Sequence, residues 1–289
     1  MFKFCFPSIL LVILTTGFSV SASLVDRQQP VPTPIPVPSA TPPPAAPRTV
    51  QILLGADADV LVENSDGKRT GVDFKSGKFV DEIPGARVVS AEASSTYILP
   101  FDKSGELYKI SISGKSSNPV TGDLSMTGPG FVVGFRGLSL VSRQVQMMGI
   151  ASNGLHLWLT ANQDGLSPQI FLTSQSGRGK PSYRFEVTSS VLEVGKTFTV
   201  DLNADKGLVY FKTDSVKKDS FTVMMRRTNP GGTRDVFTHK DISFSAKNSY
   251  AMDFGQWDGK SAVCFYVAGD LESAEKKQCT NLENESSSP

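Results

Sequence analysis

The sequence has few of the residues on which catalytic sites depend. Its 289 residues include only two histidines, His156 and His239. A Ser-His-Asp site would need one of them, and no Gly-x-Ser-x-Gly nucleophile elbow occurs. His156 lies in an apolar strand pattern beside Trp158 and His239 lies in a polar turn, so both are interpreted as structural. We therefore expect no catalytic residues and no enzymatic activity.

An excess of charge of one sign is also absent. Lys and Arg total 29 and Asp and Glu total 28, which gives a net charge of +1 with no dense basic block. This balance argues against nucleic-acid binding, because such proteins concentrate positive charge. No cysteine or histidine cluster suggests a metal site or a cofactor, and we expect neither. One loop has side-chain oxygens that could bind calcium, from Asp57, Asp59, Glu63, Asn64 and Asp66. Their spacing is not that of an EF-hand.

Long apolar runs are confined to the N-terminus. Lys3 precedes an apolar run that lasts to about Val20, and small residues then offer a cleavage site before Ser23. The run is shorter than the roughly 20 residues that cross a bilayer. We predict a signal peptide over residues 1–22, export to the periplasm, the cell surface or the medium, and no membrane span in the mature chain. Proline dominates residues 23–48, which predicts a disordered polyproline-II linker.

Cysteine is scarce as well. Cleavage of the signal peptide removes Cys5 and leaves Cys264 and Cys279, which are 15 positions apart. In an oxidising compartment these two residues are expected to form a disulfide, with two unpaired thiols as the alternative. Closing that loop would stabilise the fold by about 3 kcal/mol in the chain-entropy model.

Short β-type runs dominate the rest of the chain, and no amphipathic helix of three turns is evident. Residues 108–113 alternate apolar and polar side chains, as in a half-buried strand. Gly, Asn, Asp and Ser turns separate such runs, which is typical of β-sandwiches. We predict an all-β fold with two tandem antiparallel β-sandwich domains, over residues 49–148 and 149–280. The boundary is placed within 145–154, and residues 281–289 are expected to be a disordered polar tail.

Residues 66–86 contain a Gly-x-Arg-x-Gly-x-Asp turn at 67–73, Ser-Gly at 76–77 and Glu-Ile-Pro-Gly at 82–85. This segment resembles one that recurs in uncharacterised exported bacterial surface proteins, where it opens a small β-sandwich. The resemblance extends over about residues 50–140. It implies a sandwich fold and a place outside the cell, but no activity. An acidic stretch that often follows is replaced here by the neutral residues 90–95, which weakens the expectation of calcium binding.

The segment 253–259 offers the most suggestive binding cluster. Trp257 could stack on a sugar ring while Asp253 or Asp258 accepts hydrogen bonds from its hydroxyls; the preferred alternative is a turn with a buried aromatic plug. The sequence predicts a non-catalytic exported protein that binds a cell-surface or extracellular component, such as carbohydrate. One alternative is an assembly module whose sheet edges pair with another protein. A carboxylate hydrolase is a distant third.

Overall fold

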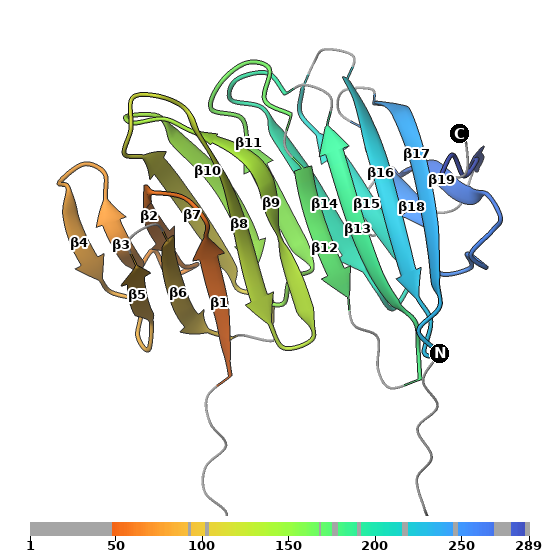
Figure 1. Ribbon diagram of the computed structural model, residues 1–289, viewed down its shortest axis with the longest axis horizontal. Helices are drawn as coiled ribbons and strands as arrows, with labels where there is room; N and C mark the ends of the chain where they lie inside the picture. Colours follow the sequence, from red (N-terminus) through yellow and green to blue (C-terminus); the bar gives the residue numbers. More distant parts are fainter. Residues whose placement is uncertain are drawn as a thin grey trace, which may run out of the picture. The chain divides into compact units, whose positions relative to one another are not determined.

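The computed structural model describes residues 48–91, 94–101, 104–167, 169–174, 179–189, 192–215, 219–244, 248–268 and 279–286. The predicted signal peptide, and the predicted linker apart from Arg48, lie outside these residues. Within them every regular element is a β-strand and every paired strand is antiparallel, which confirms the all-β prediction (Figure 1). None of these residues belongs to a helix that is long and apolar enough to cross a membrane.

The strands of the described residues form two sheets. The nine-stranded sheet runs in the order β17 (Arg234–Phe244), β16 (Asp219–Thr228), β13 (Ser182–Ser189), β12 (Gln169–Ser174), β9 (Phe131–Leu140), β8 (Val120–Gly128), β1 (Thr49–Leu54), β6 (Ser94–Pro100), β5 (Arg87–Ala91). The eleven-stranded sheet runs in the order β20 (Thr280–Leu282), β19 (Val263–Ala268), β18 (Ser249–Asp253), β15 (Leu208–Thr213), β14 (Thr197–Asn203), β11 (His156–Thr160), β10 (Val145–Ala151), β7 (Leu107–Gly114), β2 (Ala58–Glu63), β3 (Arg69–Asp73), β4 (Lys78–Asp81).

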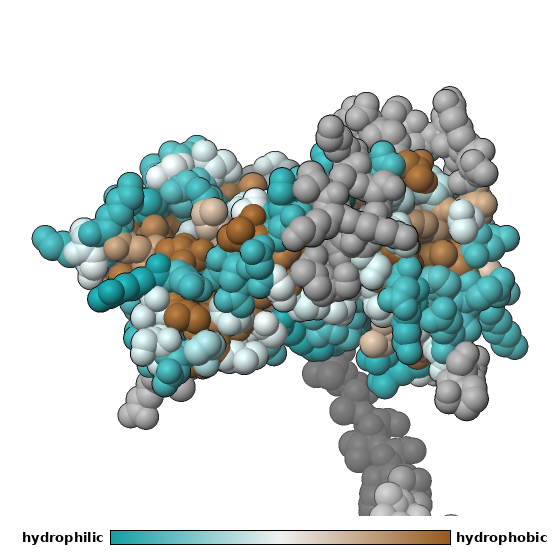
Figure 2. All heavy atoms as spheres, turned by 90° about the horizontal axis from the view of Figure 1, so that it is seen from above, coloured by the Kyte–Doolittle hydropathy of each residue, from teal (hydrophilic) through white to brown (hydrophobic). Residues whose placement is uncertain are grey.

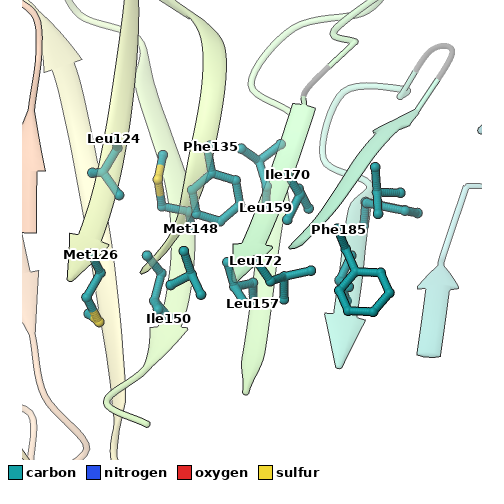
Figure 3. Close-up of a cluster of buried hydrophobic side chains, with 14 of the residues drawn as sticks. Leu124, Met126, Phe135, Met148, Ile150, Leu157, Leu159, Ile170, Leu172 and Phe185 are labelled. Carbon is teal, nitrogen blue, oxygen red and sulfur yellow. The ribbon is translucent and has the colours of Figure 1, made fainter. Parts of the chain in front are cut away.

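The core lies between the inner faces of the two sheets. In β7 the alternate residues Tyr108, Ile110 and Ile112 are fully buried, as the period of two requires. Figure 3 shows side chains of both layers pointing into the shared space, among them Phe135 of β9 and Leu159 of β11. The outer faces and the strand ends carry most of the polar residues. Seen from above in Figure 2, hydrophilic surface is interrupted by apolar patches.

The predicted domain boundary between residues 148 and 149 falls inside β10. This strand pairs with β7 on one side and with β11 on the other, and β9 pairs with β12 in the opposite layer. Residues 46–289 also group as one compact unit. The two predicted sandwiches are therefore one continuous pair of sheets. Local sequence could not reveal this, because it shows where strands lie but not which strands pair across 30 or more residues.

The C-terminal residues correct another prediction. Residues 281–286 were expected to be disordered, but β20 pairs with β19 and the following residues lie along β17. Asn284 Nδ2 donates to the Val236 carbonyl at 2.8 Å, and its Oδ1 accepts from the Thr238 amide at 3.1 Å. The Glu285 amide donates to the Thr238 carbonyl at 2.8 Å. These bonds cover part of the β17 edge, which would otherwise be open to another strand.

Cys264 in β19 and Cys279, just before β20, are disulfide-bonded, with Cα atoms 5.5 Å apart. The predicted pairing is thus confirmed. Because β20 is only three residues long, this covalent link holds the edge strand to its neighbour more firmly than its few ladder hydrogen bonds could.

The Gly-x-Arg-x-Gly-x-Asp segment has a structural role in the β3–β4 hairpin. Arg69 lies 3.8 Å from Asp73 and 3.5 Å from Glu82, measured between nitrogen and oxygen atoms. The Asp73 carboxylate also accepts hydrogen bonds from the Lys75 amide and the Ser76 hydroxyl, and these bonds lower its pKa. Gly71 has a φ of +125°, and a Cβ there would lie 2.1 Å from the Val60 carbonyl oxygen.

We expect Gly71→Ala to lower the free energy of unfolding by about 2 kcal/mol or more, since it combines backbone strain with a clash against main chain. Gly77→Ala is the matched control. Gly77 also has positive φ, at +68°, but open space surrounds it, so about 1 kcal/mol is expected. Urea unfolding of both variants measures the difference. Equal losses would show that the close approach to Val60 does not matter.

Candidate functional site

The structure places Trp257 where it cannot serve as a sugar platform. Its side chain is 4% exposed and packs with its ring edge-to-face against Phe237, at 6.1 Å between centroids. The indole Nε1 donates to the Ser261 carbonyl at 2.9 Å, and the Trp257 carbonyl accepts from Arg227 at 3.0 Å. The prediction of Trp257 as a ligand-stacking residue is therefore wrong, because packing and hydrogen bonds already use the ring.

The two acids of the same segment also have structural roles. Asp258 Oδ1 accepts from the amides of Lys260 and Ser261, at 2.8 and 2.7 Å, and these bonds lower the pKa of its carboxyl to about 2. Asp253 is buried at the end of β18 and accepts from the Gly255 amide at 3.2 Å. The segment is thus the turn with an aromatic plug that the sequence favoured over a binding site.

A different set of polar and aromatic residues gathers on the outer face of the eleven-stranded sheet. Strand pairing places five residues in one row across β11, β14, β15, β18 and β19: His156, Asp201, Tyr210, Ala251 and Tyr266. Their neighbours along each strand, such as Leu157 and Val200, point into the core. The row therefore brings together residues that are up to 110 positions apart in the chain.

His156 and Asp201 form the polar end of this row. His156 Nδ1 is hydrogen-bonded to Asp201 Oδ1, and both side chains remain partly exposed. This hydrogen bond and the negative charge of Asp201 raise the pKa of His156 above its usual 6.5. Farther along the row, burial raises the pKa of Tyr210, with a smaller contribution from Asp201. Burial, with Tyr210 and Asp253 nearby, raises the pKa of Tyr266 to about 12.

An open hollow of about 620 Å³ lies at this row. Its lining is rich in side chains that donate and accept hydrogen bonds: Asn153, His156, Asp201, Asn203, Lys206 and Tyr210. Asn153 belongs to the turn between β10 and β11, and Lys206 belongs to the turn between β14 and β15. Two loops and three strands thus supply these polar side chains, and the β6–β7 connection and β10 complete the lining.

Trp158 lies two residues beyond His156 on the same face of β11 and is partly exposed. It pairs directly with Gly149 of β10. A Cβ on Gly149 would lie 2.0 Å from the indole Nε1, so the ring occupies the space above this glycine. The alternation of His156 and Trp158 with Leu157 and Leu159 already indicates an outward Trp158. Its glycine partner could be found only from the strand pairing.

Three of the five residues considered for calcium, Asp57, Asp59 and Asn64, have side-chain oxygens engaged in other contacts. Lys115 Nζ lies 2.9 Å from Asp57 and 3.9 Å from Asp59. Asn64 Oδ1 accepts from the amides of Asp66 and Lys68, at 3.2 and 2.9 Å. Within the described ranges, no group of three or more His, Cys, Asp or Glu side chains is arranged to hold a metal ion.

Comparisons with known proteins found no matching family model, no matching curated protein and no matching solved structure. The resemblance of residues 50–140 to exported bacterial surface proteins remains a prediction.

A pH titration tests the His156–Asp201 pair. A histidine pKa that is raised by folding adds stability below its unfolded value near 6.5, and this stability is lost as pH rises through the folded pKa. We expect the NMR signal of the His156 ring to titrate above 6.5, and Asp201→Asn to lower that pKa. The backbone amide signal of His239, in β17 of the opposite sheet, is the internal reference and should be unaffected by the substitution. An unchanged His156 titration in Asp201→Asn would contradict the pairing.

Proposed function

We propose that this chain is a non-catalytic exported protein that binds carbohydrate of a cell surface or extracellular matrix through the outer face of its eleven-stranded sheet. The observation that carries the proposal is the partly exposed Trp158, which is held over Gly149 and lies two residues along β11 from His156, a lining residue of the polar hollow. A flat apolar ring beside converging hydrogen-bonding groups suits a ligand that has both apolar C–H surface and many hydroxyls.

The spacing along β11 fits one ligand that uses both features. His156 and Trp158 are two residues apart, which is about 7 Å along a strand. A sugar ring on Trp158 would leave its neighbouring hydroxyls or the next sugar unit over His156 and Asp201. Asp201 would accept hydrogen bonds from hydroxyls, while Lys206 and Asn203 could donate to ring or hydroxyl oxygens.

The composition of the hollow favours binding over hydrolysis. Of the described residues that line it, Asp201 is the only carboxylate, and its Oδ1 is bonded to His156. Hydrolysis of a glycosidic bond generally uses two carboxylates, one as acid and one as base or nucleophile. A ligand bound here would therefore meet hydrogen-bonding groups but not a pair of catalytic acids.

Two features support a place outside the cytoplasm. The N-terminal sequence has the pattern of a cleavable signal peptide, and Cys264 and Cys279 are bonded to each other. Such a bond persists in oxidising compartments and is rare in the reducing cytosol.

The test is a glycan array followed by titration of the glycans that bind. Trp257→Phe removes the buried indole of the chain's two tryptophans and leaves Trp158 as the fluorescence reporter. We expect bound glycan to change Trp158 emission, and Trp158→Ala to weaken binding about tenfold or more. Gly149→Ala should also weaken binding, because its methyl group displaces the indole without removing it.

Leu53→Ala is the control, since Leu53 is exposed on the outer face of the opposite sheet and should not affect binding. Selective glycan binding that survives both Trp158→Ala and Gly149→Ala would move the site elsewhere. A silent array with folded protein would leave the proposed function without support.

A second candidate function is assembly through sheet edges, and the uncovered edges favour it. The β17 edge is partly covered by residues 283–286, but in the described part of the chain β5 and β4 have no outer neighbour. Val89 of β5 is 59% exposed and Phe79 of β4 is 56% exposed. Such strands can add a strand of a second copy by backbone pairing.

Sedimentation velocity over a range of concentrations distinguishes this function from glycan binding. If β5 and β4 pair with a second copy, Val89→Lys and Phe79→Lys should reduce the fraction of dimer or higher species, because Lys disfavours edge pairing. Trp158→Ala should leave that fraction unchanged. A monomer at all concentrations, without dependence on these substitutions, would rule out self-assembly through these edges.

A further inference from the structure

The outer face of the nine-stranded sheet carries a cluster of arginines at its β17 end. Arg184 of β13 pairs directly across the ladder with Arg226 of β16. Arg234 of β17 pairs with Thr228, the next outward residue after Arg226 on β16. The strands β13, β16 and β17 lie side by side (Figure 1), and their pairing places these three arginines at neighbouring positions on one face.

These arginines surround a small hollow of about 200 Å³. Thr173, Ser182 and Thr228, which carry aliphatic hydroxyl groups, also line it, and Tyr183 completes the lining. Guanidinium and hydroxyl groups all donate hydrogen bonds, and a guanidinium cannot lose its proton in a protein. The hollow therefore presents a concentration of donors and positive charge.

Arg184 is held in place from the side away from this hollow. Its Nε and Nη2 both lie 2.8 Å from Glu186 Oε1, and its guanidinium lies 5.7 Å from the centroid of the Phe171 ring. Arg136 approaches the same carboxylate at 3.7 Å and the same ring at 4.9 Å. Glu186 thus contacts two arginines. It pairs with Met224 of β16, which lies two residues before Arg226.

Arg226 and Arg234 lack such a carboxylate in the described part of the chain. Across the described residues, no ion pair joins either of them to Asp or Glu. Asp235 follows Arg234 in the chain, but the alternation of side chains along a strand turns it to the other face. There its Oδ2 accepts a hydrogen bond from Asn229 Nδ2 at 3.0 Å. Like charges directly opposite each other in a sheet repel, and Glu186 offsets this repulsion only in part because Arg184 shares it with Arg136.

We propose that this hollow binds one oxyanion group, namely a sulfate, phosphate or carboxylate, carried by an acidic extracellular polymer. Arginine is suited to this role because its planar fork matches the paired oxygens of such groups. Arg226 and Arg234 would neutralise the anion and the hydroxyls would donate to its remaining oxygens. Arg184, fixed by Glu186 and Phe171, would be positioned before the anion arrives. The site lies on the sheet opposite to Trp158 and does not depend on the carbohydrate proposal, whereas the extracellular source of its ligand rests on the proposed export.

The test is calorimetric titration of the purified protein at constant ionic strength. One arm uses inorganic sulfate and phosphate, and the other uses a sulfated oligosaccharide with its unsulfated counterpart. We expect saturable binding of the sulfated oligosaccharide and weaker binding of the free anions, whereas any binding of the unsulfated sugar should not depend on Arg226 or Arg234. Arg226→Gln and Arg234→Gln should each weaken binding about ten- to a hundredfold, as for the loss of a hydrogen bond to a charged group.

Arg87→Gln is the matched control. It removes the same charge from β5, at the opposite edge of the same sheet, and should change affinity less than twofold. Equal weakening in all three variants would show a general charge effect and overturn the site. Free anions that bind as tightly as the sulfated oligosaccharide would overturn the polymer as the ligand and leave a site for small anions.

Thermal unfolding supplies a second readout that does not need a known ligand. Without added anion, Arg226→Gln should raise the melting temperature, because it removes the repulsion with Arg184. Sulfate should raise the melting temperature of the unsubstituted protein more than that of the variant, since only the former has the complete site. A variant that is less stable than the unsubstituted protein, with the same response to sulfate, would contradict the proposal.

Discussion

The constraint on which the structure depends is the alternation of side chains between two faces of each strand. Every second residue must enter the space between the two sheets, and those residues are apolar along nearly every strand. They form one cluster that extends from Val50 in the first strand to Leu282 in the last. Because the core is shared by both layers along their whole length, the two halves of the chain are one folded unit.

The outer faces of the two sheets share one arrangement of an aromatic ring and a glycine. On the eleven-stranded sheet the indole of Trp158 lies over Gly149. On the nine-stranded sheet Phe171 pairs with Gly134, where a Cβ would lie 2.9 Å from its ring. In each case a glycine in the neighbouring strand makes room for an aromatic ring close to the sheet. Polar groups gather beside each ring: His156 and Asp201 beside the first, arginines beside the second.

The two ends of the pair of sheets differ in how far their edge strands are covered. At one end the disulfide of Cys264 and residues 283–286 join β19, β20 and β17, so backbone groups of the β17 edge are satisfied within the chain. At the other end β4 and β5 keep one side without a partner among the described residues. The two sandwich faces and the uncovered end therefore offer separate surfaces, which is the reason that carbohydrate binding, anion binding and assembly can be tested independently.

The sequence by itself determined the strand content and the disulfide pair. The pattern of β7, where Tyr108, Ile110 and Ile112 alternate with polar residues, is local and needs no knowledge of other strands. Only the tertiary structure decided which strands pair, and with that the sites. It buried Trp257 against Phe237, although its sequence neighbours Asp253 and Asp258 suggested a binding loop. It brought His156 next to Asp201 and Arg184 next to Arg226, pairs separated by 45 and 42 positions in the chain. The physical reason is that side-chain direction follows from local backbone geometry, whereas cross-strand neighbours follow from packing of the whole chain.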